Sequence, residues 1–186
     1  MKCFIINDLQ KATVKAKANF LVAMGIFNYI EILGSFYYYE KNTPCQARFD
    51  YTLRHLFPNA YINLYTQIKR MCSEKVQVYD ILRCGLTHEY LVKTYKKGKK
   101  TLEINYQIIG VDDVVAYGSL VQSRKCGIEI ITLDNKRYYM KIYNPRLIYD
   151  LNLAFEEFKK RLIGNLGDCR ERFKERCKII HLENFI

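Results

Sequence analysis

Residues Phe20 to Phe36 read FLVAMGIFNYIEILGSF and form the longest apolar segment of the chain. Its single charged residue is Glu31, so the segment is apolar on nearly every side. A helix of this kind lies at the centre of a core or buries a second face against a partner subunit. Asn19, Asn28 and Glu31 interrupt the best membrane candidate, Ala18 to Phe36, which falls short of the roughly 20 apolar residues that a membrane span needs. We therefore expect a buried helix and no membrane segment.

Further helices are predicted on both sides of this stretch. Asn7 or Asp8 can cap a helix that continues through it to about Glu40. Near the C-terminus, Asn144 is a good N-cap and Pro145 is favoured at a first helical position. Apolar residues at helical spacing and the turns between them predict helices over 45–56, 61–71, 76–95, 145–163 and 168–180.

A different pattern occupies residues 99–143. Residues 101–109 alternate as a strand, and 114–120 predict a short helix or turn. Two β-rich runs, 127–133 and 137–143, flank Asp134-Asn135-Lys136, which is typical of a hairpin. We predict a mainly α fold in one domain, an up-and-down helical bundle with a small antiparallel β insertion. It comprises core helices over 1–98, the insertion over 99–143, and C-terminal helices over 144–186.

Charge and cysteine content limit the kind of partner and compartment. The formal net charge is +11, from 30 basic and 19 acidic residues. Such an excess favours polyanions, and we expect RNA as a partner. The seven cysteines form no C-x-x-C pair and are odd in number, which argues against a zinc knuckle and a secreted disulfide framework. The first eleven residues do not form a signal peptide. We expect a cytoplasmic protein with no metal and no cofactor.

The candidate active residues lie in the segment RCGLTHEY, from Arg83 to Tyr90. Arginine offers a planar fork of N–H donors that matches phosphate oxygens, and it stays charged. Histidine titrates near neutral pH and serves as a general acid or base. Arg83 and His88 would therefore suffice for metal-independent RNA cleavage, in which the ribose 2′-hydroxyl is the nucleophile and arginine balances the charge on phosphate oxygens.

Helix geometry places a condition on this pair. On a straight α-helix, residues 83 and 88 lie about 140° apart around the axis. Gly85 weakens the helix interior and permits a bend that would bring the two side chains together. The other arrangement is a two-fold dimer in which residues of both subunits meet.

The spacing of these residues resembles a known family. Arg83-x4-His88 on the last core helix of an α-bundle resembles the Arg-x(4–6)-His signature of the HEPN superfamily of ribonucleases and toxins. The longer form, with Tyr90, is similar to the signature of HEPN toxins that pair with minimal nucleotidyltransferase antitoxins. The resemblance implies a HEPN-like bundle, a homodimer with a composite cleft, and metal-independent endoribonuclease activity. It assigns Arg83 and His88 as the catalytic pair, and Tyr90 as the tyrosine that the antitoxin modifies with AMP.

Other interpretations of the same residues remain open. Five lysines after the motif would guide a phosphate backbone toward it, or would simply form an exposed basic turn: Lys93, Lys96, Lys97, Lys99 and Lys100. Arg83 could instead pair with Asp80 or Glu89 on the helix surface. Cys84, where the active family usually has a polar residue, favours a non-catalytic RNA- or nucleotide-binding module. A third interpretation is a dimeric protein-interaction scaffold.

Overall fold

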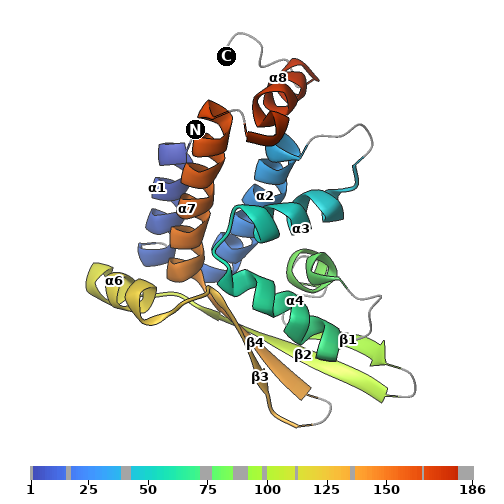
Figure 1. The fold of residues 1–186 in the computed structure, drawn as a ribbon. Coiled ribbons are helices and arrows are strands. Elements are labelled where there is room, and N and C mark those ends of the chain that lie inside the picture. The colour runs from blue at the N-terminus through green and yellow to red at the C-terminus, as the bar shows by residue number, and fades with distance from the viewer. Residues whose placement is uncertain are drawn as a thin grey trace.

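The computed structural model describes residues 2–15, 18–38, 43–71, 77–85, 92–97, 100–111, 113–134, 137–164 and 166–179. The protein is mainly helical and carries one small four-stranded sheet (Figure 1). Its helical elements are α1 (Lys2–Val14), α2 (Asn19–Tyr37), α3 (Cys45–His55), α4 (Ala60–Met71), a π-helical turn η1 (Asp80–Gly85), α6 (Val114–Ser123), α7 (Asn144–Ile163), a 3-10 turn η2 (Leu166–Asp168) and α8 (Cys169–Ile179). The strands are β1 (Val92–Lys97), β2 (Lys100–Ile109), β3 (Ile128–Thr132) and β4 (Arg137–Tyr143).

Helix α2 lies in the core, as its sequence predicts. Ala23, Phe27, Ile30 and Gly34 follow a 4-3-4 spacing along one stripe, and all four are buried. The helix contacts α1, α3, α7 and α8. In the described part of the chain it is the one helix long and apolar enough to cross a membrane by length and composition. More than half of its apolar window is buried inside the protein.

The predicted helix from residue 8 to 40 is wrong in its extent, because the structure has two helices there. The chain turns between α1 and α2, where the Ala18 amide donates to the Ala12 carbonyl at 3.1 Å. Helix α1 lies beside α7, whereas α2 also packs against α3 (Figure 1). Asn7 and Asp8, the predicted caps, are exposed positions within α1. Both helices contact α7, and α2 packs in addition against α3 and α8. Tertiary contacts of this kind override a continuous helical pattern.

The sheet has the order β1-β2-β4-β3. Its outer pairs are antiparallel, and the hairpin predicted over 127–143 is confirmed as β3 and β4. The central pair, β2 and β4, is parallel, so the prediction of a wholly antiparallel sheet is wrong. Parallel neighbours require a crossover connection rather than a tight turn. Here the connection contains α6 and β3.

The predicted helix over 76–95 is confirmed only in part. Residues 78–85 are helical, but residues 92–97 form strand β1. Val92, Thr94 and Tyr95 favour strands, and β1 pairs along its length with β2. The β region therefore begins before residue 99, the predicted start of the insertion. Pairing with a distant strand decides this segment.

One face of the sheet packs against the helices. Ile104 on β2 and Met140 and Ile142 on β4 are fully buried, and Ile128 on β3 is nearly so. These residues belong to the same hydrophobic core as α2, α4 and α7. Figure 1 shows the helices gathered on one side of the strands, with α4 close to β3 and α7 following directly from β4.

Candidate functional site

Arg83 lies in η1 and faces helix α2. Its Nε atom is 3.6 Å from the Glu31 carboxylate, and both side chains are about one-fifth exposed. From the sequence, the candidate partners of Arg83 were Asp80 and Glu89. Glu31 was not among them, because it is 52 positions away in the chain. An ion pair between two half-buried side chains restricts the plane of the guanidinium group. The guanidinium group of the motif arginine is therefore oriented by a second helix.

Tyr79 completes a cluster that we call the Arg83 cluster, formed by Glu31, Tyr79 and Arg83. The Tyr79 hydroxyl donates to the Glu31 carboxylate at 3.4 Å. Its ring meets Phe49 of α3 edge-on, with centroids 5.4 Å apart. Burial, followed by the nearby Glu31 carboxylate, raises the pKa of Tyr79 to about 12. The phenol therefore stays protonated at neutral pH and can keep donating to Glu31.

The sheet also positions this turn. The Tyr106 hydroxyl of β2 donates to the Ile81 carbonyl of η1 at 2.7 Å, in a buried environment. Tyr106 itself is nearly fully buried, and β1 contacts η1 as well. When a side chain donates a hydrogen bond to a backbone carbonyl inside a helix, the regular i→i−4 backbone hydrogen bonds are commonly interrupted there. The strands thus hold the segment that carries Arg83.

The π-helical winding of η1 bears on the spacing of the motif. A π-helix forms i→i+5 hydrogen bonds, so residues five apart lie nearer one face than on an α-helix. The described turn ends at Gly85, the glycine that the sequence identifies as a weak point. His88 and Tyr90 lie outside the described residues. The structure therefore locates the arginine of the motif on a π-helical turn that is described as far as Gly85.

The basic segment after the motif lies on a two-stranded ribbon. Lys93, Lys96 and Lys97 belong to β1 and Lys100 begins β2, with Lys97 and Lys100 as backbone partners. Lys99 lies outside the described residues, as do the side chains of the other four. The antiparallel pairing brings the backbone positions of the four described lysines into one ribbon beside η1.

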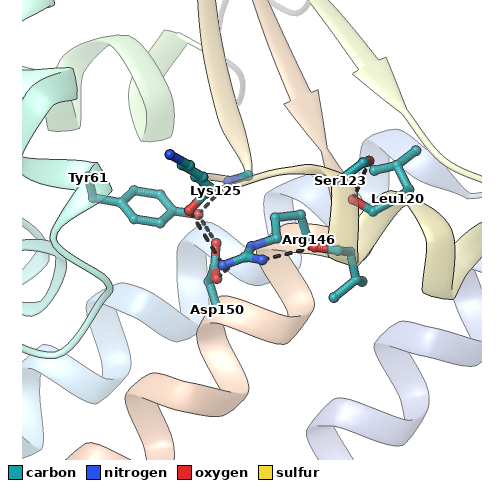
Figure 2. A network of polar contacts seen from close by, with 8 residues as sticks. Tyr61, Leu120, Ser123, Lys125, Arg146 and Asp150 are labelled. Carbon is teal, nitrogen blue, oxygen red and sulfur yellow. Dashed lines mark hydrogen bonds and ion pairs between the residues drawn. The ribbon is translucent and has the colours of Figure 1, made fainter.

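A second polar cluster joins α4, α7 and Gly127, the residue before β3 (Figure 2). Tyr61 donates to the Asp150 carboxylate at 2.7 Å, and the Gly127 amide donates to the Tyr61 hydroxyl at 3.0 Å. Arg146 Nε lies 2.9 Å from Asp150, one helical turn away. The guanidinium also donates to the Val121 carbonyl at 2.9 Å. The cluster connects the loop after α6 to the bundle.

The burial of this second cluster explains its role. Asp150 and Tyr61 are fully buried, and Arg146 is mostly buried. Burial raises the pKa of Asp150, while the hydrogen bond from Tyr61 and the charge of Arg146 oppose that rise. A buried carboxylate is tolerated only when it is paired and hydrogen-bonded. All three side chains are used in holding the strands to the helices, so we treat the cluster as structural.

Sequence reasoning missed the partners of Arg83. Glu31 was noted only as an interruption of the apolar run, yet a single acid in a 17-residue apolar stretch signals a buried partner. Tyr79 and Tyr106 gave no signal among sixteen tyrosines. In the described ranges, no three His, Cys, Asp or Glu side chains gather as a metal site. Comparisons of the chain with protein-family models, curated proteins and solved structures found no match.

Proposed function

We propose that this chain is a HEPN-like, metal-independent endoribonuclease that acts as a toxin or defence component. The observation that carries the proposal is the Arg83-x4-His88 spacing, on a segment whose arginine is oriented by Glu31. The net charge of +11 supports an RNA substrate. The π-helical winding of η1 over Asp80–Gly85 also supports the proposal, because it departs from α-helical spacing in the turn that carries Arg83.

In the proposed reaction, a ribose 2′-oxygen attacks the adjacent phosphorus and displaces the 5′-oxygen of the next nucleotide. His88 moves a proton, either from the 2′-hydroxyl or to the departing 5′-oxygen. Arg83 stabilises the charge that builds on the phosphate oxygens. The products are a 2′,3′-cyclic phosphate and a free 5′-hydroxyl, and no redox step or metal is required.

A homodimer is part of this proposal, since a second subunit would supply the other arginine–histidine pair of a composite cleft. Tyr90 would be the position that a nucleotidyltransferase antitoxin modifies with AMP. The lysines of the β1–β2 ribbon would attract the RNA backbone toward η1.

Cleavage of single-stranded RNA in the presence of EDTA tests the proposal. We expect the wild type to cut, and His88→Ala to cut about 10²- to 10⁴-fold more slowly, as is typical when a general acid or base is lost. Arg83→Lys should also be slow, because lysine keeps the charge but loses the planar fork. Arg137→Ala is the matched control, since this arginine is paired with Asp134 on the exposed hairpin.

The absence of cleavage by the wild type, equal rates for wild type and His88→Ala, or a requirement for added metal would each contradict the proposed activity. Analysis of the product ends provides an independent check, because cleavage that leaves a 5′-phosphate would require another mechanism.

A non-catalytic RNA- or nucleotide-binding module is the second candidate. It is favoured by Cys84, which follows the motif arginine, and by the bond between Tyr106 and the Ile81 carbonyl, which makes the sheet part of this region. This candidate predicts salt-sensitive RNA binding that weakens in Arg83→Ala without formation of any cleaved product.

A further inference from the structure

Two adjoining cavities open on the surface formed by α3, α4 and the start of the segment that carries Arg83. Their volumes are about 130 and 430 Å³, and Arg54, Tyr65 and Lys69 line both. We call this pair of cavities the α3–α4 groove. Asp50 lines the smaller cavity and His55 the larger. Arg54 and His55 are both exposed.

An acidic group lies in the smaller cavity. Asp50 Oδ1 accepts a hydrogen bond from the Tyr65 hydroxyl at 3.0 Å. Within the described ranges, its other oxygen, Oδ2, receives no hydrogen bond, although a carboxylate has capacity for several. Burial raises the pKa of Asp50 to about 6, so the group is ionised at neutral pH. The cavity therefore offers a charged acceptor to a ligand with N–H donors.

The wall of the groove is flat and cationic. The Arg54 guanidinium lies 4.2 Å from the centre of the Tyr65 ring, over its face. Arg54 is one turn from Asp50 on α3, and Lys69 is one turn from Tyr65 on α4, so the four side chains share one face of the helix pair. Nucleic-acid bases stack on arginine planes and on aromatic rings. Lys69 is exposed at the edge, where a phosphate could meet it.

We propose that the α3–α4 groove binds a guanine nucleotide, with the base edge on Asp50, the base plane against Arg54 and the phosphate at Lys69. Guanine presents two adjacent N–H donors, at N1 and N2, which match the two oxygens of one carboxylate. Adenine and cytosine place a ring acceptor beside their single amino group, and uracil flanks its N–H with two carbonyls. Each of these would put an acceptor against the charged oxygens of Asp50.

This inference rests on the proposed function and deepens it, because it assigns the base that a substrate RNA presents. Gln77 and Val78, at the start of the helical segment that carries Arg83, also line the smaller cavity. A guanosine held there would lie along the same segment as the proposed catalytic arginine. Cleavage near guanosine residues follows from that arrangement.

Direct binding of GMP, AMP, CMP, UMP and inorganic phosphate to the full chain, measured by calorimetry, tests the site without requiring cleavage. We expect saturable binding of GMP at least tenfold tighter than that of the other ligands, in the range that one good bidentate base contact supplies. Asp50→Asn should lose this preference, because the amide offers one acceptor and no charge. Lys69→Ala should weaken GMP binding several-fold.

Matched controls separate the site from general charge and from folding. Lys159→Ala removes another exposed helical lysine, on α7, and should leave GMP binding unchanged. Asparagine at position 50 can still accept the Tyr65 hydrogen bond, and thermal melting verifies that the variant folds. Lys69→Ala changes an exposed side chain, so it tests the groove even if Asp50→Asn fails to fold.

The outcomes distinguish this site from the proposed ribonuclease. Lack of saturable GMP binding, equal affinity for all four nucleotides, or wild-type binding by both Asp50→Asn and Lys69→Ala would overturn the groove as a guanine site. Cleavage of RNA without GMP binding would overturn the groove and leave the ribonuclease. GMP binding by a chain that cuts no RNA would support the groove and contradict the ribonuclease.

Discussion

At the scale of single residues, two aspartate–arginine ion pairs have similar N–O distances but differ in how deeply they are buried. Asp150 lies 2.9 Å from Arg146 and is fully buried, whereas Asp134 lies 2.7 Å from Arg137 on the exposed hairpin. The Coulomb attraction of an exposed pair is largely offset by solvent and side-chain entropy. In a buried pair, removal of one partner leaves the other charge without compensation. Removal of one partner should therefore lower the free energy of unfolding more in the buried pair than in the exposed pair.

We expect Asp150→Ala to lower the free energy of unfolding by about 3–5 kcal/mol, because Arg146 and Tyr61 would lose their shared partner. Asp134→Ala should lower the free energy of unfolding by less than about 1 kcal/mol. Urea unfolding of both variants beside the wild type measures the difference. Equal decreases in the free energy of unfolding would show that the Tyr61–Asp150–Arg146 cluster does not stabilise the fold as we infer.

At the scale of elements, the close approach of α2 and α3 depends on a single glycine. A Cβ atom at Gly34 would lie 2.3 Å from the Arg48 carbonyl oxygen and 2.5 Å from the Thr52 hydroxyl. The backbone oxygen belongs to a helix and cannot move without displacing α3. By contrast, a Cβ atom at Gly118 in α6 would meet nothing within 4 Å.

Gly34→Ala should therefore destabilise the protein by about 2 kcal/mol or more, since overpacking forces a helix to shift. Gly118→Ala should be neutral or stabilising by about 0.5–1 kcal/mol, because alanine loses less entropy in a helix. Thermal or urea unfolding of the two variants provides the comparison. A neutral Gly34→Ala would mean that α2 and α3 are packed less tightly than described.

At the scale of the whole molecule, the charge excess is the property most relevant to a partner. The formal net charge of +11 is carried by a chain of 186 residues. Part of the excess lies on the β1–β2 ribbon, and part lies at the α3–α4 groove. Lysine and arginine that neutralise phosphates release counterions, which makes nucleic-acid binding depend on salt.

If about four phosphates are contacted, the logarithm of the RNA association constant should fall with the logarithm of salt concentration at a slope near −3. Between 50 and 200 mM salt this is about a fiftyfold loss of affinity. Fluorescence anisotropy with a labelled RNA at several salt concentrations measures the slope. An affinity independent of salt would argue against an electrostatic RNA interface and favour the protein-interaction scaffold.

Some elements of the structure could be predicted from the sequence and others could not. The helices at 45–55, 60–71 and 144–163 and the β3–β4 hairpin were predictable, because apolar spacing and turn residues are local information. Strand β1 was not, since its conformation depends on pairing with β2. Arg83 stands out by its spacing to His88, and Glu31 as the single acid of an apolar run. Their pairing was not predictable, because the two residues meet only when α2 and η1 pack together.

Local patterns in the sequence predict a mainly helical protein with a buried apolar helical stretch over residues 20–36, a strong positive charge and a candidate Arg83–His88 motif. Those properties follow from composition and short-range periodicity. Only the tertiary structure decided the break between α1 and α2, the parallel pairing of β2 and β4, and the contacts of η1 with Glu31 and Tyr106. Each of these depends on residues far apart in the chain, whose free energy of interaction exists only once the core has formed.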